Sequence, residues 1–264
     1  MTFSVSSLYG GQVCFSNHPP KLIVICGPCR VGTTALSMVF AESSVESHMQ
    51  PIKSARRAKE IGQEPIPWKI GNKNSEFALA KETLGVKTEA EFFDPLDILL
   101  NLGYPKQRLV LIPILRDPRQ TLASWKEKWG HVEFQKFVLA HELTLEIMEK
   151  AEKNGVLTIP YVHEMIRDKN PEVVAKKLFE KIGLVKRQSS KRAKARWKDL
   201  KENKNVFLYD SPPDKFIDGI KERGKHEYRY RVFSARDEKL VESFPRLDII
   251  YETLYKLCQS CLDF

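Results

Sequence analysis

Two motifs of different chemistry overlap between Val24 and Phe40. Cys26 and Cys29 have the C-x-x-C spacing of a dithiol redox pair. The stretch Gly27–Thr34 reads GPCRVGTT, a loop bracketed by glycines whose backbone N–H groups could bind a phosphate. Both motifs stand between an expected strand and an expected helix, and a helix N-terminus stabilises a thiolate as well as a phosphate. The surrounding residues must therefore decide between the two chemistries.

The redox interpretation is the weaker of the two. Ile25 stands where thioredoxin-type sites have an aromatic residue, and the chain is more than twice as long as such a domain requires. Gly27 and Gly32 instead fit G-x-x-x-x-G followed by hydroxyl residues, which is typical of a phosphate-binding loop. Thr33 occupies the position of the lysine that nucleoside triphosphatases use. ATP or GTP hydrolysis is therefore not favoured, although Arg30 offers a positive charge within the loop.

A second element with phosphate chemistry begins at the end of an apolar run, 108–115. Arg116 follows this expected strand, and Asp117 and Pro118 are the cap and first residue of an expected helix. Ser124 lies eight residues after Arg116, about two turns into that helix. An arginine at a strand end and a serine on the next helix can hold one phosphate between them. Together with the loop at 27–34, this predicts a ligand with phosphates at two ends.

Strands and helices are expected to alternate, which predicts an α/β protein with a parallel sheet flanked by helices. Pro113 is unusual in a buried strand because proline removes a backbone donor. We expect one domain over 1–264, with a core at about 20–184 and a basic flap and closing loop at about 186–233. The expected strands are 21–26, 45–53, 108–115 and 155–162, and the expected helices are 33–43, 117–129, 171–184 and about 234–258.

Composition indicates a soluble, cytoplasmic protein. The 264 residues are 42% hydrophobic, with neither a secretory start nor an apolar run long enough for a membrane span. Five cysteines argue against a disulfide framework. Cys258 and Cys261 form a second C-x-x-C, which raises the alternative of a structural zinc, but this pair and the first stand at opposite ends of the chain, so no metal site is predicted.

The net charge of +9 is concentrated between Lys186 and Lys204, where nine Lys and Arg face two acids. This segment suits a solvated helix face, a flap over an anionic ligand or a nucleic-acid patch. Trp197 is its one aromatic residue and gives little support for base stacking. Nucleic-acid binding is therefore retained only as an alternative.

In these two motifs the chain resembles the sulfotransferases that use 3′-phosphoadenosine 5′-phosphosulfate (PAPS). Their 5′-phosphosulfate loop is similar to Arg30–Thr34, and their 3′-phosphate element is similar to Arg116-Asp117-Pro118 followed by Ser124. Three further segments resemble the family and follow its order along the chain, from about 20 to 255. These are GVKTEAEFFD at 85–94, with Glu89 in place of a proline, IPYVHEMIRDKNPEVVAKKLFEKIGL at 159–184, and ERGKHEYRYRVFS at 222–234.

The resemblance implies a P-loop fold like that of nucleoside triphosphatases, PAPS as cofactor and no required metal. It implies electrostatic catalysis by Arg30 and Lys87, which would face the charge that develops during transfer. The implied cofactor-binding residues are Gly27, Arg30, Val31, Gly32, Thr33, Thr34, Arg116, Ser124, Arg223, Gly224 and Lys225.

The chain differs from the family at the position of the expected general base. Many members have Glu-Pro on the strand after the first helix, whereas Gln50-Pro51 stands here, and an amide is no base at neutral pH. His48 would share a strand face with Gln50 and has a suitable ordinary pKa, so it is the first candidate, unless it is a surface histidine. Glu46 continues the alternation and is a further candidate for the base, and Gln50 and Glu46 are the predicted substrate-binding residues.

No motif specifies the acceptor, and a hydroxyl, amine or carbamoyl nitrogen of a small natural product is the expectation. The whole chain is similar to cyanobacterial sulfotransferases of saxitoxin-type toxin pathways. A cationic toxin would require acids, for which Glu46, Glu64, Glu89 and Glu91 are candidates. The alternatives are a P-loop kinase or nucleoside triphosphatase, a basic nucleic-acid-binding module, and a sulfotransferase fold that binds nucleotide without turnover.

Overall fold

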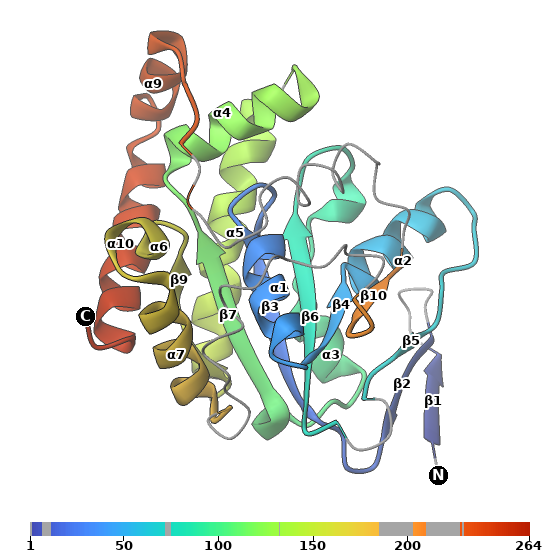
Figure 1. The fold of residues 1–264 in the computed structure, drawn as a ribbon. Helices are drawn as coiled ribbons and strands as arrows, with labels where there is room; N and C mark the ends of the chain where they lie inside the picture. Colours follow the sequence, from blue (N-terminus) through green and yellow to red (C-terminus); the bar gives the residue numbers. More distant parts are fainter. Residues whose placement is uncertain are drawn as a thin grey trace.

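The computed structural model describes residues 2–6, 12–71, 75–131, 133–184, 203–209, 228 and 230–264. In this part of the chain the strands form two sheets, a main sheet of seven strands and a smaller sheet of three (Figure 1). The main-sheet strands are β3 (Lys21–Pro28), β4 (Glu46–Met49), β6 (Phe77–Leu84), β7 (Leu109–Leu115), β8 (Leu157–Thr158), β9 (Tyr161–Val162) and β10 (Val206–Leu208). The smaller sheet contains β1 (Thr2–Ser6), β2 (Gln12–Ser16) and β5 (Trp68–Lys69).

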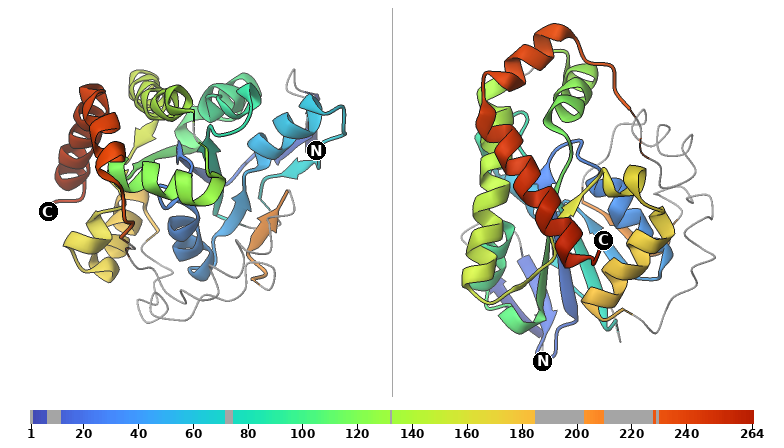
Figure 2. Two further views of the ribbon diagram at one scale, coloured as in Figure 1. Left: turned by 90° about the horizontal axis from the view of Figure 1, so that it is seen from above. Right: turned by 90° about the vertical axis from the view of Figure 1, so that its left-hand side faces the viewer.

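Helices connect the strands and cover both faces of the main sheet (Figure 2). The α-helices are α1 (Thr33–Glu42), α2 (Pro51–Glu60), α3 (Pro95–Asn101), α4 (Pro118–Trp129), α5 (Phe134–Lys153), α6 (Met165–Asp168), α7 (Pro171–Ile182), α9 (Ala235–Glu242) and α10 (Pro245–Cys261). Two short 3₁₀ turns are η1 (Glu89–Glu91) and η2 (Lys106–Arg108).

The order of the main sheet is β10-β4-β6-β3-β7-β8, with β9 also paired to β7, and all these pairs are parallel. This confirms the predicted α/β class with a mostly parallel sheet. From β3 the chain crosses through α1 to β4 on one side, whereas from β7 it proceeds to β8 on the other side. The carboxyl ends of β3 and β7 therefore form a topological switch point, the usual ligand position in open α/β sheets.

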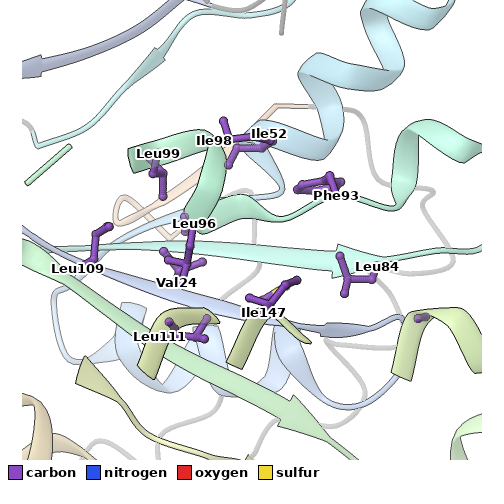
Figure 3. Close-up of a cluster of buried hydrophobic side chains, with 14 of the residues drawn as sticks. Val24, Ile52, Leu84, Phe93, Leu96, Ile98, Leu99, Leu109, Leu111 and Ile147 are labelled. Atoms are coloured by element: carbon purple, nitrogen blue, oxygen red, sulfur yellow. The ribbon is translucent and has the colours of Figure 1, made fainter. Parts of the chain in front are cut away.

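The apolar run of β3 is buried because both faces of this central strand are covered. Leu22 and Val24 belong to a core cluster with α3 and α5 on one side of the sheet (Figure 3). Ile23 and Ile25 belong to a second cluster with α1, α7 and α10 on the other side. All four are 0% exposed, which explains a continuous apolar run in place of an alternating one.

Pro113 fits within β7 because one side of the strand is interrupted at that point. Its neighbour β8 pairs with Val110 and Leu111, and β9 pairs with Ile114 and Leu115. The break between β8 and β9 leaves Pro113 without a ladder partner on that side, so its missing N–H has no hydrogen bond to lose. The predicted third core strand at 155–162 is accordingly two short strands.

Several predicted boundaries are wrong, for identifiable reasons. The strand expected at 45–53 ends at Met49, because Gln50 adopts the left-handed conformation (φ 58°) and Pro51 begins α2. The single C-terminal helix is two helices, separated by Ser243 and Phe244. Strand β6 and helices α3 and α5 were not predicted, and β10 lies in the segment that was expected to be a flap.

Local signals were reliable at the helix ends that carried capping residues. Asp117 accepts hydrogen bonds from the N–H groups of Arg119 and Gln120, as predicted for α4. Gly183, in the left-handed conformation, ends α7. No helix within the described residues has the length and apolarity to cross a membrane.

Candidate functional site: the carboxyl edge of β3, β6 and β7

The N-terminus of α1 has no side-chain cap. Gly32 is its N-cap residue and makes no side-chain hydrogen bond, and no acid lies in the first turn. In contrast, Glu82 accepts hydrogen bonds from Ile52 and Lys53 at the start of α2, and Asp117 caps α4. The free N–H groups and the helix dipole of α1 therefore favour an anion at the switch point.

The loop before α1 is held by α4, which begins next to Arg116. Arg30 Nε donates a hydrogen bond to Ser124 Oγ over 3.1 Å. Trp125 Nε1 donates to the carbonyl oxygen of Cys29. The structure thus brings together two predicted cofactor-binding residues from motifs that are 94 positions apart in the chain.

Gly27 and Gly32 are required for different reasons. Gly27 lies within β3, and a Cβ there would stand 2.0 Å from the carbonyl oxygen of Ile114 in β7. Its role is therefore close strand packing, although the sequence analysis placed it at the start of the phosphate-binding loop. Gly32 has φ +97°, and a Cβ there would stand 2.5 Å from Nδ1 of His163. Of the other loop residues, Val31 and Thr33 are buried and Thr34 is partly exposed.

Arg116 lies at the end of β7 and is only 5% exposed. Its Nη2 donates to Gln120 Oε1 over 3.3 Å, and its guanidinium carbon lies 4.9 Å from the centroid of the Tyr228 ring. Tyr228 in turn donates to Glu164 Oε1 over 2.8 Å, and burial raises the pKa of Glu164. Arg116 is thus held by Gln120 of α4 and by the Tyr228 ring, which is itself bonded to Glu164.

Backbone strain is concentrated at this edge. Three of the five non-glycine residues with positive φ in the described part of the chain follow adjacent strands: Arg30 after β3 (φ 72°), Gln50 after β4 (φ 58°) and Val86 after β6 (φ 141°). Such conformations cost roughly 1–3 kcal/mol each and persist where surrounding contacts enforce them. They occur where three loops meet the end of the sheet, which is the expected place for a ligand site.

Lys81 and Thr83 are site residues that the sequence analysis missed. Both lie near the carboxyl end of β6 and are buried, and Met49↔Lys81 pairing places them on the α1 side of the sheet. Lys81 Nζ and Thr83 Oγ1 donate to Gln50 Oε1 over 2.9 and 2.6 Å. The available signal was three consecutive polar residues, Lys81 to Thr83, after an apolar run and shortly before Gly85.

The solvent exposures of Lys87 and Glu91 differ from those expected of a catalytic lysine and of an acid that binds the acceptor. Lys87 is exposed, whereas Glu91 is 0% exposed and pairs with Lys53 (3.0 Å) and Arg57 (2.7 Å). Lys53 Nζ also donates to Gly85 O over 2.9 Å, so this ion cluster supports the loop after β6. Glu91 is therefore an internal residue, not a recognition group for a cationic acceptor, while Glu89 is exposed.

His48 is buried in a hydrogen-bonded chain. It is 1% exposed, its Nε2 lies 2.7 Å from Glu46 Oε1 and its Nδ1 lies 2.8 Å from Tyr209 Oη. Pairing of His48 with Ala80, and of Met49 with Lys81, puts His48 on the opposite side of the sheet from Lys81 and Thr83. The expectation that His48 and Gln50 share a strand face is wrong, because Gln50 lies outside the strand and its side chain bonds to Lys81 and Thr83.

Burial of Glu82 gives a pH prediction. Desolvation in the 0% exposed site raises the pKa of Glu82 from 4.5 to about 7, against the lowering effect of two backbone N–H donors. Between these values the folded protein holds a proton that the unfolded chain has released, so the free energy of unfolding falls as pH rises from 4.5 to about 7. Glu82→Gln should reduce this fall, as measured by urea unfolding from pH 5 to 8. Glu89→Gln, in an exposed position, is the control, and an unchanged slope in Glu82→Gln would refute the assignment.

The remaining predicted residues fall outside the site or outside the described chain. Cys26 and Cys258 belong to core clusters on opposite faces of the sheet, and all five cysteines are free. Within the described residues no group of His, Cys, Asp and Glu has a metal-binding arrangement. Arg223, Gly224 and Lys225, and most of the basic segment at 186–204, lie outside the described residues.

Comparison of the chain with protein-family models and with curated proteins gives no match. The resemblance to PAPS-dependent sulfotransferases therefore depends on the motifs alone.

Proposed function

We propose that the protein is an enzyme that transfers a sulfuryl group from PAPS to a hydroxyl, amine or carbamoyl nitrogen of a small natural product. The observation that carries the proposal is the 3.1 Å contact between Arg30 and Ser124 at the switch point. It joins the two phosphate motifs beside the uncapped N-terminus of α1. A ligand with phosphates at two ends, as expected from the sequence, suits this arrangement.

The residues present fit the chemistry of such a cofactor. PAPS supplies a sulfuryl group on a phosphosulfate anhydride, and its transfer leaves negative charge on the nucleotide phosphate. The N–H groups of Gly32, Thr33 and Thr34 and the side chain of Arg30 would stabilise that charge, and one such donor is worth roughly 2.7–4 kcal/mol. We assign to Lys81 the electrostatic role expected of Lys87, because Lys81 is buried near the carboxyl end of β6, whereas Lys53, also buried there, pairs with Glu91. Arg116 would bind the other phosphate.

The acceptor is proposed only by chemical class. The resemblance favours a saxitoxin-type cation, but of the four acids considered for it, Glu46 and Glu91 are buried and bonded within the protein. Glu64 and Glu89 are exposed. A small hydroxyl or amine acceptor is therefore the class to screen first.

Binding of adenosine 3′,5′-bisphosphate (PAP) tests the proposal. Arg30→Ala should weaken PAP binding about 10–100-fold in calorimetry in EDTA, because it removes one charged hydrogen-bonding group from the phosphate loop. The matched control is Arg108→Ala, which removes the same charge from an exposed residue at the amino end of β7. Equal affinities of the two variants would contradict the site assignment.

The alternatives give different results in the same experiment. A P-loop kinase or nucleoside triphosphatase would bind Mg-ATP in preference to PAP, although Thr33 stands in the lysine position of such loops. A nucleic-acid-binding module would bind a short DNA duplex with steep salt dependence. Absence of PAP binding, with either of these ligands bound, would reject the sulfotransferase proposal.

A further inference from the structure

A chain of three side chains leads from the interior to the carboxyl edge of the sheet at β4 and β10. Glu46 and His48 are two residues apart on β4, and Tyr209 directly follows β10. Leu208 pairs with Met49, so Tyr209 stands one position beyond the last paired residues, level with Gln50. The three are joined by contacts of 2.7 and 2.8 Å.

The imidazole in this chain is held in one position by contacts on its ring faces, its edge and both nitrogens. Its ring stacks on Phe207, with centroids 5.0 Å apart and planes at 25°, and meets Trp68 edge-on at 5.9 Å. Glu46 also accepts hydrogen bonds from the N–H of Gly71 (3.1 Å) and from Ser75 Oγ (3.4 Å). Carboxylate, imidazole and hydroxyl in sequence form the arrangement by which hydrolases activate an oxygen atom.

His48 cannot itself touch an acceptor, because both ring nitrogens contact protein groups and the residue is 1% exposed. Gln50 offers no basic atom, and its oxygen already accepts from Lys81 and Thr83. Of the three linked residues, only Tyr209 is partly exposed. It stands at the same edge of the sheet as the uncapped N-terminus of α1.

We propose that Tyr209 is a catalytic residue that takes the acceptor's proton, and that His48 and Glu46 are positioning residues that relay a proton away from it. The inference depends on the proposed sulfuryl transfer. The acceptor oxygen or nitrogen forms its bond to sulfur while the bond from sulfur to the nucleotide phosphate breaks, and that electron pair leaves on the phosphate oxygen. The acceptor's proton passes to Tyr209 Oη, the phenolic proton passes to His48 Nδ1, and the Nε2 proton passes to Glu46.

The relay predicts which acceptors need Tyr209. A general base contributes about 10²–10⁴-fold to rate, and only where the acceptor must lose a proton during the reaction. Tyr209→Phe should therefore slow transfer from PAPS to ethanol by about 10²-fold or more. Transfer to 4-nitrophenol, whose hydroxyl ionises near neutral pH, should be nearly unchanged. PAP affinity should match that of the wild type.

Tyr104→Phe is the matched control, since Tyr104 is a buried tyrosine that donates to the backbone oxygen of Pro20. Glu46→Gln is the second relay variant and should show the same dependence on acceptor acidity. PAP affinity and the melting temperature report whether each variant is folded.

A rate loss of equal size for ethanol and 4-nitrophenol, or no loss for either, would overturn the relay and leave the cofactor proposal standing. A wild-type protein that binds PAP but transfers to neither probe would also overturn it, whereas failure to bind PAP rejects the proposed function itself.

Discussion

Glu91→Ala is expected to lower the free energy of unfolding by about 3–5 kcal/mol, because it leaves a buried ammonium group without its carboxylate. Lys53 and Glu91 are 1% and 0% exposed, and their charged atoms lie 3.0 Å apart. Glu91 also accepts from Arg57 and from the N–H of Lys87, so its removal affects the whole loop after β6. Urea unfolding monitored by circular dichroism measures the change.

Two comparisons make this prediction specific. Glu89→Ala removes an exposed acid from the same 3₁₀ turn and should change stability by less than about 0.5 kcal/mol. The double variant Lys53→Met/Glu91→Leu replaces both partners by apolar groups and should be more stable than Glu91→Ala alone. A double variant as unstable as Glu91→Ala would show that the unpaired charge of Lys53 is not the cause of the lost stability.

Gly27→Ala is expected to destabilise the protein by about 3 kcal/mol, at the upper end of the range for inserting one methyl group into a packed core. The new Cβ would stand 2.0 Å from the Ile114 carbonyl oxygen, which is backbone and cannot rotate away. The central pair β3 and β7 would have to separate at Cys26↔Pro113, next to the phosphate loop. Thermal and urea unfolding both report the loss.

Gly103→Ala is the control for this substitution. Gly103 has φ +82° but nothing within 4 Å of a built Cβ, so the variant should lose only the roughly 1–2 kcal/mol of left-handed strain. A Gly27→Ala protein as stable as Gly103→Ala would contradict the close packing of the two strands.

Features with local signals were predictable from the sequence. The apolar run before Gly27 predicted β3, and Asp117-Pro118 predicted the start of α4, because strand burial and helix capping depend on neighbouring residues. Spacing also singled out the loop at Gly27–Thr34 and, as a partner of Arg116, Ser124; the structure puts Arg30 of that loop in contact with Ser124.

Features that depend on distant partners were not predictable in this way. Strand β6 was missed because Lys81, Glu82 and Thr83 are polar, yet each bonds to Gln50 or to the start of α2, about 30 positions away. The environment of His48 depends on Tyr209, 161 positions further along the chain. Its burial therefore had no signal near His48 itself.

The pairing of β10 with β4 has a consequence for the order in which the molecule assembles. The contacts among β3, β4, β6, β7 and the short strands up to Val162 join segments that emerge early during synthesis. Strand β10 closes a loop of about 160 residues, and such long-range contacts carry a large entropic cost and form late. We therefore expect the sheet to form from the centre outwards, with docking of β10 as a late kinetic step. The bond between His48 and Tyr209 can form only then, so a nascent chain that has already built its phosphate loop still lacks the linked carboxylate, imidazole and phenol.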